Sequence, residues 1–255
     1  MLTKIKIEQE LKAVGIMPPK IIFYDVTDST NTRAKEYARN NPGCKDTVVF
    51  IANEQTAGRG RMGRSFVSRG GAGIYISILT YPDEAASDTT KATARAAVLL
   101  ARATEAVCSC SIGIKWVNDL YLDGKKLAGI LTEGEVDESG KIAYQIIGMG
   151  INIYKNAISD EISDIATSLE HHINRVPDRS KLLAMIIKEM LHTSDDCYAE
   201  YCERSVIIGK SVRVMKLSEE YGAIVEEINP DFSLTVKRDN GEAERLFTGE
   251  IRIKI

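Results

Sequence analysis

Three arginines and three glycines lie within seven positions in the run Gly58-Arg59-Gly60-Arg61-Met62-Gly63-Arg64. Glycine lets the main chain come close to a ligand, so backbone N–H groups can converge on phosphate oxygens while guanidinium groups neutralise them. The run therefore predicts a loop that binds a phosphate or another anion. A solvated basic loop without a ligand is the alternative, because short basic loops are common and also occur in nucleic-acid binders.

A second polar group surrounds the only tryptophan, in the run Lys115-Trp116-Val117-Asn118-Asp119, and Lys126 follows soon after. Asp119 could coordinate Mg²⁺ through oxygen, and Lys126 could meet a phosphate as a point charge. The alternative is a pair of hairpin turns with solvated lysines. A third segment, Gly148-Met149-Gly150-Ile151-Asn152, is glycine-rich at the end of an apolar run. Three such segments on one sheet are hard to explain as independent turns.

Composition restricts the kind of ligand. The chain has 255 residues, 44% of them hydrophobic, which is enough for one large domain or for one domain and a small appendage. A net charge of −3 argues against a general nucleic-acid binder and favours a small anionic ligand at a local arginine cluster. Five cysteines without paired metal-ligand spacing, and three histidines, indicate neither a disulfide scaffold nor a zinc site.

No apolar run approaches the roughly 20 residues that a membrane-spanning helix needs, and the first twelve residues are charged throughout. We therefore expect no signal peptide and no membrane anchor, and the cytoplasm is the expected compartment.

The elements that position these residues are strands and helices in mixed order. Residues 28–30 supply capping side chains for a helix that begins near residue 31. Apolar runs predict strands at 21–26, 47–52, 73–81, 112–117, 126–133 and 142–153, and helical spacing predicts helices at 31–39, 88–107 and 178–204. The fold class expected is α+β, a mixed, hairpin-rich sheet with packed helices.

The pattern changes after residue 206. Short strands are predicted at 212–214, 223–225, 233–236, 245–247 and 251–253, with turns at 229–231 and 239–241. Five short strands in this space indicate a small β-barrel. We expect a domain of residues 1–206, which carries the polar groups above, and a second domain of residues 207–255.

Together these motifs resemble those of the biotin protein ligases. The resemblance is carried by Asp28-Ser29-Thr30-Asn31, by Gln55 with the arginine run, and by Lys115-Trp116-Val117-Asn118-Asp119, Lys126-Leu127-Ala128-Gly129-Ile130 and Gly148-Met149-Gly150-Ile151-Asn152. They occur in the family's order and spacing. The resemblance covers roughly residues 21–255, including an SH3-like C-terminal barrel, and is to the class without an N-terminal DNA-binding domain.

The resemblance implies a reaction in two steps. The enzyme would join biotin to the α-phosphate of MgATP, releasing pyrophosphate and leaving biotinyl-5'-AMP. A lysine of a biotin carboxyl carrier domain, such as that of a biotin-dependent carboxylase, would then attack this mixed anhydride to give an amide and AMP. ATP, biotin and Mg²⁺ are the cofactors implied. No DNA or membrane partner is expected, and a homodimer through an exposed sheet edge is allowed.

The resemblance also assigns roles to residues. Catalytic roles would fall to Arg59, Arg61 and Lys126. Biotin would contact Ser29, Thr30, Asn31, Gln55, Gly58, Arg59, Lys126 and Gly129. ATP would contact Arg61, Met62, Gly63, Arg64, Phe66, Asn118 and Asn152. Asp119 is the acid expected to face a metal. Ser29 and Thr30 are also explained by helix capping alone.

The chain departs from the family's pattern at three positions. Phe66 stands where the family usually has tryptophan, Val117 where it commonly has proline, and Met62 where some members carry another arginine. A lipoate or octanoate ligase of the same fold is the first rival hypothesis, and Gln55 beside the intact arginine run favours biotin over it. A nucleic-acid-binding module is the second rival, from a different class.

Overall fold

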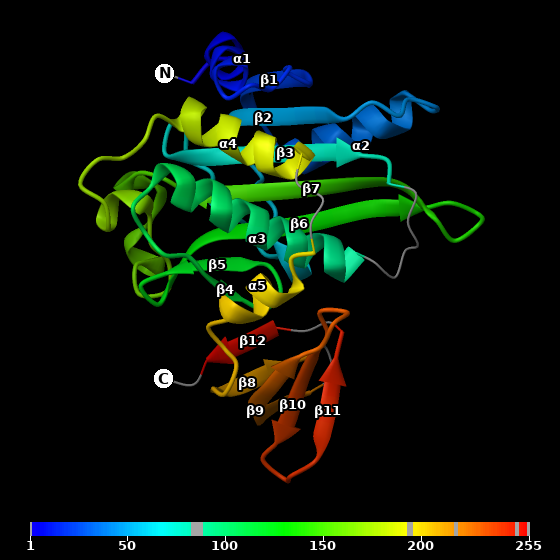
Figure 1. Ribbon diagram of the computed structural model, residues 1–255, viewed down its shortest axis with the longest axis vertical. Coiled ribbons are helices and arrows are strands. Elements are labelled where there is room, and N and C mark those ends of the chain that lie inside the picture. The colour runs from blue at the N-terminus through cyan, green and yellow to red at the C-terminus, as the bar shows by residue number, and fades with distance from the viewer. Residues whose placement is uncertain (1, 83–88, 193–195, 217–218, 248–249, 254–255) are drawn as a thin grey trace.

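The computed structural model describes residues 2–82, 89–192, 196–216, 219–247 and 250–253. Within these residues, seven strands form one large sheet with helices on both faces, and five strands form a smaller sheet at the C-terminal end (Figure 1). This arrangement confirms the expected α+β class.

The large sheet has the strand order β1-β2-β3-β7-β6-β5-β4. Strands β1 and β2 are parallel, whereas all other neighbours are antiparallel. Three successive hairpins link β4 to β7, so the sheet is mixed and rich in hairpins, as expected. The strands are β1 Lys20–Thr27, β2 Val48–Gln55, β3 Gly73–Thr80, β4 Gly113–Lys115, β5 Asp119–Leu122, β6 Lys125–Val136 and β7 Ile142–Asn152.

Helices cover both faces of this sheet, which explains the continuous apolar runs of β2 and β3. Side chains alternate along β2, so Val48 and Phe50 pack on the face of α2, while Val49 and Ile51 join the core beneath α3 and α4. The helices are α1 Lys4–Ala13, α2 Thr30–Asn40, α3 Thr89–Val107, α4 Arg179–His192 and α5 Tyr198–Glu203 (Figure 1). Residue 88, where the second predicted helix begins, lies outside the described residues.

The single helix predicted over residues 178–204 was wrong. Helix α4 ends at His192 and α5 begins at Tyr198. Asp196 lies outside both helices, and its Oδ1 accepts a hydrogen bond of 3.0 Å from the backbone N–H of Tyr198. An aspartate that bonds a backbone N–H two residues on favours a helix start over a helix interior.

The strand predicted at 112–117 is shorter in the structure. Strand β4 stops at Lys115, the chain turns through Trp116, Val117 and Asn118, and Lys115 then pairs with Asp119 of β5. The peptide bond between Trp116 and Val117 is cis. Asn118 joins this turn to β6, because its Nδ2 donates to the carbonyl of Ile130 at 2.9 Å. Helix α1 was not predicted from the sequence.

The C-terminal sheet is antiparallel, with the order β11-β10-β9-β8-β12, and fits an SH3-like barrel. It contacts the larger part through Phe232, whose carbonyl accepts a 2.7 Å hydrogen bond from Trp116 Nε1 and whose ring packs edge-on against Tyr201. The domain boundary at residue 207 stays a prediction. The strands are β8 Ser211–Met215, β9 Glu220–Ile228, β10 Leu234–Arg238, β11 Ala243–Leu246 and β12 Glu250–Ile253.

None of the helices in the described part of the chain is both long and apolar enough to cross a membrane.

Candidate active site

Two adjoining pockets open at the end of the large sheet where β2 ends and β3 and β6 begin. The first is lined by Ser29, Thr30, Asn31, Gln55, Arg59, Gly60, Arg61, Phe66, Asn118, Lys126, Gly129, Ile130, Leu131, Gly148, Met149 and Gly150. The second is lined by Gly60, Arg61, Met62, Arg64, Ser65, Phe66, Lys115, Trp116, Asn118, Asp119, Lys126 and Ile251. Their shared residues are Gly60, Arg61, Phe66, Asn118 and Lys126.

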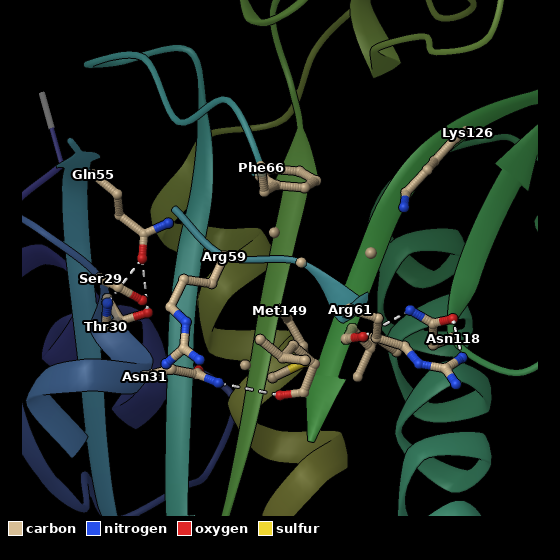
Figure 2. A pocket seen from close by; sticks show the side chains of 16 residues that line it. Ser29, Thr30, Asn31, Gln55, Arg59, Arg61, Phe66, Asn118, Lys126 and Met149 are labelled. Atoms are coloured by element: carbon tan, nitrogen blue, oxygen red, sulfur yellow. Dashed lines mark hydrogen bonds between the residues drawn. The ribbon is translucent and has the colours of Figure 1, made fainter. Parts of the chain in front are cut away.

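One side of the first pocket is formed by the neutral polar residues Ser29, Thr30 and Gln55, which we call the neutral polar wall. Gln55 Oε1 accepts a 2.8 Å hydrogen bond from the backbone N–H of Thr30 and lies 3.1 Å from Thr30 Oγ1 (Figure 2). Gln55 Nε2 donates to Ser68 Oγ at 2.8 Å. An amide held at both ends has a fixed orientation. Gln55 thus presents a fixed polar edge to the pocket from the end of β2.

The expected capping of α2 by its own side chains was wrong. Ser29 occupies the N-cap position, but its side chain makes no capping hydrogen bond, and Gln55 supplies the acceptor from β2 instead. Within the described residues, the Ser29 hydroxyl has no hydrogen-bond partner, although the residue is only 3% exposed. Capping therefore does not explain Ser29, whose hydroxyl remains available to a ligand in the first pocket.

Asp28 fixes the backbone just before this wall. Burial acts to raise the pKa of its carboxyl group, but hydrogen bonds from the Ser29 N–H and from Arg33 outweigh burial and hold the pKa below its usual value. Asp28 Oδ1 accepts from Ser29 N at 2.6 Å, and Asp28 Oδ2 lies 3.1 Å from Arg33 Nη2. The ionised acid thereby sets the conformation that presents Ser29 and Thr30.

Asn31 is the centre of a buried network beneath the pocket. Its Oδ1 accepts from Ser77 Oγ at 2.6 Å, and its Nδ2 donates to Glu133 Oε2 at 2.9 Å. Gly148 is required beside it, because a Cβ at that position would lie 2.1 Å from Asn31 Oδ1. Sequence reasoning missed Ser77 and Glu133, whereas the glycine-rich run had marked Gly148.

The arginine run forms a short hairpin loop between β2 and β3. Its two sides are joined by hydrogen bonds from Gly60 N to Arg64 O at 2.7 Å and from Phe66 N to Gly58 O at 2.8 Å. At the tip, Met62 has a φ of 54° and Gly63 a φ of 74°. Gly58 itself leaves no room for a side chain, since a Cβ would lie 2.3 Å from the carbonyl oxygen of Phe66.

The two central arginines point in different directions from this loop (Figure 2). Arg59 reaches into the first pocket, where its Nη2 lies 3.1 Å from Glu133 Oε1. Arg61 turns to the other side and donates from Nη1 to Asn118 Oδ1 at 3.0 Å. Arg61 therefore stands where the two pockets meet, and Arg59 lies within the first pocket.

Phe66 forms part of the boundary between the pockets. Its ring lies against β7, where a Cβ on Gly150 would come within 2.6 Å of Phe66 Cε1. Figure 2 shows the ring above this strand, between Gln55 and Lys126. The glycine thus lets an aromatic ring pack closely against the sheet at the pocket boundary, in a position where it could stack on a planar ligand.

Lys126 is the only lysine that lines both pockets among the described residues. Its Nζ lies 2.7 Å from Asp119 Oδ1 on the neighbouring strand. Gly129 leaves room for this side chain, because a Cβ at that position would lie 3.1 Å from Nζ. The lysine is therefore held at the junction by an acid, with its charge available to a ligand in either pocket.

Asp119 is the one carboxylate among the residues that line the second pocket. No group of three or more His, Cys, Asp or Glu side chains is placed to hold a metal ion in the part of the chain that the structure describes. Mg²⁺ commonly uses one or two carboxylates together with substrate phosphates, and a single acid in a pocket lined by arginine and lysine side chains fits that pattern.

Most of the predicted site residues come together in these pockets, but three do not line them. Gly58 and Gly63 belong to the arginine loop but line neither pocket. Asn152 is buried, and its Nδ2 donates to the carbonyl of Thr167 at 3.1 Å. Their ligand contacts stay predictions. The predicted ligand contacts did not include the other residues that line the pockets, which are Gly60, Ser65, Lys115, Trp116, Ile130, Leu131, Gly148, Met149, Gly150 and Ile251.

Comparison with known proteins identifies the family of this chain. The family model described as the biotin/lipoate A/B protein ligase family matches residues 23–152, about half of the chain, from within β1 to the end of β7. The chain belongs to this family. The matched range contains the neutral polar wall, the arginine loop and Lys126.

Relatives within the biotin/lipoate A/B protein ligase family include two bacterial proteins. The bifunctional ligase/repressor BirA of Bacillus subtilis is 37% identical over 188 residues, which are 73% of this chain and 56% of that protein. The biotin--[acetyl-CoA-carboxylase] ligase of Mycobacterium tuberculosis is 31% identical over 201 residues, 74% of this chain and 73% of that protein. The aligned part of the chain thus spans little more than half the length of the Bacillus relative.

Solved structures of the same fold include the biotin protein ligase of Aquifex aeolicus in complex with biotin and ATP. Its TM-score is 0.72 at 22% identity, over 92% of this chain and 98% of that one. A biotin protein ligase of Leishmania major in complex with biotinyl-5-AMP gives a TM-score of 0.61 at 22% identity, over 91% of this chain and 100% of that one.

Proposed function

We propose that this protein is an ATP-dependent biotin protein ligase that forms biotinyl-5'-AMP and transfers the biotinyl group to a lysine of a carrier domain. The observation that carries the proposal is the junction of two chemically different pockets at Arg61 and Lys126. A carboxylic acid bound in one pocket and a nucleotide bound in the other would meet at these cations.

The neutral wall of the first pocket suits the ureido ring of biotin. That ring presents two N–H donors and a carbonyl acceptor. The hydroxyl groups of Ser29 and Thr30 and the amide of Gln55 can hydrogen-bond to such groups, and none of these side chains is charged. Ile130, Leu131 and Met149 supply apolar surface for the rest of the ligand. The biotin carboxylate would then extend toward Arg59 and Lys126.

The second pocket suits the phosphates of ATP. Arg61, Arg64, Lys115 and Lys126 line it together with one acid, Asp119. Attack of the biotin carboxylate on the α-phosphate forms the new C–O–P linkage and breaks the bond to pyrophosphate, and negative charge develops on the phosphate oxygens. Cations already in place stabilise that charge more than water does, because they need no reorganisation.

Transfer to the carrier uses the same cations. The ε-amine of the carrier lysine attacks the acyl carbon of the mixed anhydride, the acyl–oxygen bond to the phosphate breaks, and AMP leaves with the negative charge next to Lys126. No nucleophilic side chain of the enzyme is needed. The arginine loop, which lines both pockets, would limit access of water to the adenylate.

The relatives support this proposal over a lipoate or octanoate ligase. Relatives in Mycobacterium tuberculosis and Paracoccus denitrificans are both named biotin--[acetyl-CoA-carboxylase] ligase. Their names also support a carrier domain of a biotin-dependent carboxylase as the partner. We further propose Mg²⁺ as the ion that accompanies ATP. Asp119 would face this ion, and the ion would neutralise phosphate charge. The cytoplasm, where ATP is supplied, is the proposed compartment, and a homodimer remains part of the proposal.

The test is ATP–pyrophosphate exchange by the purified protein with Mg²⁺ and biotin, lipoate, octanoate or no acid. We expect exchange that depends on biotin. Exchange with lipoate or octanoate instead would reassign the chain within its family. Absence of exchange with every acid would contradict the enzymatic proposal, and salt-dependent binding of DNA or RNA would then favour the nucleic-acid-binding hypothesis.

A further inference from the structure

Behind Lys126, three side chains form a continuous chain of contacts outside both pockets. Asp123 Oδ2 lies 2.6 Å from His172 Nδ1, and His172 Nε2 lies 2.7 Å from Thr167 Oγ1. Asp123 stands in the tight turn between β5 and β6, with a φ of 47°. Both ring nitrogens of His172 are thus engaged, one by the turn and one by the segment that follows β7.

The chemistry of the carboxylate fixes the direction of one of these hydrogen bonds. A carboxylate can only accept, so Nδ1 of His172 donates to Asp123, and Nε2 shares the second hydrogen bond with the Thr167 hydroxyl. Hydrolase triads share this connectivity, but an attacking hydroxyl must reach a substrate. Thr167 is only 3% exposed. The Thr167 hydroxyl is therefore poorly placed to attack a substrate.

The segment that contains Thr167 pairs with the backbone of Lys126. The N–H of Lys126 donates to the carbonyl of Ile165 at 3.0 Å, and its carbonyl accepts from the N–H of Thr167 at 2.8 Å. The pairing of β6 with β7 begins only at Ala128. On this side of β6, residues 165–167 therefore take the place of a neighbouring strand at the position of Lys126.

We propose that His172, oriented by Asp123, is a positioning residue for Lys126 and acts through Thr167. The proposal rests on the ligase function proposed above, in which Lys126 serves both half-reactions. If the segment 165–167 shifts, the backbone of Lys126 shifts with it, and Nζ leaves its place beside Asp119. A displacement of about 1 Å in a charge-stabilising group can lower a rate by up to about 10²-fold.

The variant His172→Phe tests this directly, because it keeps a ring of similar size and removes both hydrogen bonds. Thr167→Val removes only the hydroxyl at constant volume. Asp123→Asn keeps an oxygen that accepts from Nδ1 and tolerates a positive φ. His171→Phe is the matched control. His171 is the exposed neighbour, and its Nδ1 lies 2.8 Å from Ser168 Oγ.

The first readout does not depend on activity. In the folded protein, hydrogen exchange of the amides of Lys126 and Thr167 should be about fivefold faster in His172→Phe than in the wild type, as loss of one net hydrogen bond implies. Exchange at these amides should be unchanged in His171→Phe. Unchanged exchange in His172→Phe would overturn the proposal, whatever the enzyme proves to catalyse.

The second readout is biotin-dependent ATP–pyrophosphate exchange. We expect His172→Phe and Thr167→Val each to lower kcat about tenfold. The KM for biotin should stay within about twofold of the wild-type value. The double variant should have a kcat no lower than that of either single variant, because both changes break the same chain of contacts. Asp123→Asn and His171→Phe should keep wild-type kcat. Equal losses in His171→Phe, additive losses in the double variant, or a wild-type kcat in His172→Phe would each overturn the proposal. A wild-type protein without any exchange would instead contradict the ligase function itself.

Discussion

Lys126 Nζ lies 2.7 Å from Asp119 Oδ1, so the lysine shared by both pockets is paired with the acid predicted to face a metal. The pair spans neighbouring strands, β5 and β6, of one hairpin. It gives the junction of the pockets a cation whose position is set before any ligand arrives. Preorganised charge of this kind is the main source of rate enhancement that the proposed mechanism invokes.

Replacing Lys126 by alanine should therefore lower kcat for biotin-dependent pyrophosphate exchange by about 10²–10³-fold, because the charge that stabilises the transition state is lost. The matched control is Lys125→Ala. Lys125 is the preceding residue, and its Nζ donates to the carbonyl of Ser163 at 2.7 Å, away from both pockets. A loss in Lys125→Ala as large as that in Lys126→Ala would indicate a general effect on β6 and contradict the role of Lys126.

Arg61→Ala should weaken both ATP binding and catalysis, with kcat/KM for ATP falling by about 10²-fold, because Arg61 lines both pockets. Steady-state kinetics with varied ATP at saturating biotin measures this loss. Arg69→Ala is the control from the same connection between β2 and β3, since Arg69 Nη1 donates to the carbonyl of Asn156 outside the pockets. If Arg61→Ala keeps wild-type kcat/KM, the arginine does not neutralise phosphate charge.

Glu133→Gln should bind biotin about two- to fivefold more tightly than the wild type. Glu133 holds Arg59 at 3.1 Å, and the Arg59 side chain is 49% exposed, so the pair is a weak one that the biotin carboxylate must replace. Glutamine still accepts from Asn31 Nδ2 but carries no charge. Calorimetric titration with biotin measures the difference, and the effect should vanish in an Arg59→Ala background. Weaker binding by Glu133→Gln would mean that Glu133 prepares Arg59 for the ligand.

The stability of the C-terminal barrel should depend on acid pH through Glu244 and Asp231. Partial burial acts to raise the pKa of Glu244, but hydrogen bonds from Lys216, Tyr221 and Arg238 outweigh burial and lower it to about 2. Hydrogen bonds from Ser233, followed by Arg245, lower the pKa of Asp231 to about 2 as well.

Because these folded-state pKa values lie below the unfolded ones, the stabilisation is complete above about pH 4.5 and is lost as the pH falls toward 2. Urea unfolding followed at a series of pH values should show the free energy of unfolding falling through this window. Glu244→Gln should have a shallower fall than wild type. Identical slopes for the two proteins would show that Glu244 does not contribute.

The strands and the arginine loop could be predicted from the sequence because their signals are local. Strands β2 and β3 are continuous apolar runs, buried on both faces, and the glycines and arginines between them leave few alternatives to a loop. The break between α4 and α5 was missed because Met190 and Tyr198 were counted in one interrupted apolar stripe, whereas the contact that precedes α5 is a hydrogen bond from the Tyr198 N–H to Asp196.

The partners of the site residues could not be predicted, because they are distant in the sequence. Ser77 contacts Asn31 across 46 positions, and Glu133 contacts Asn31 across 102. The sequence alone does not indicate which residue a serine within an apolar strand will contact, because that depends on the strand register. The same holds for Thr167, which meets Lys126 only because residues 165–167 pair with the start of β6, and for His172, which contacts Thr167.

The central claim is that the two pockets together make and hold an acyl adenylate. The most direct measurement is a single-turnover reaction of the protein with [α-³²P]ATP, Mg²⁺ and biotin, followed by separation of the products and then by addition of a biotin carboxyl carrier domain. We expect labelled biotinyl-5'-AMP to form on the enzyme only when biotin is present, and to be converted to labelled AMP as the carrier becomes biotinylated. Failure to form any biotin-dependent labelled adenylate would contradict the account.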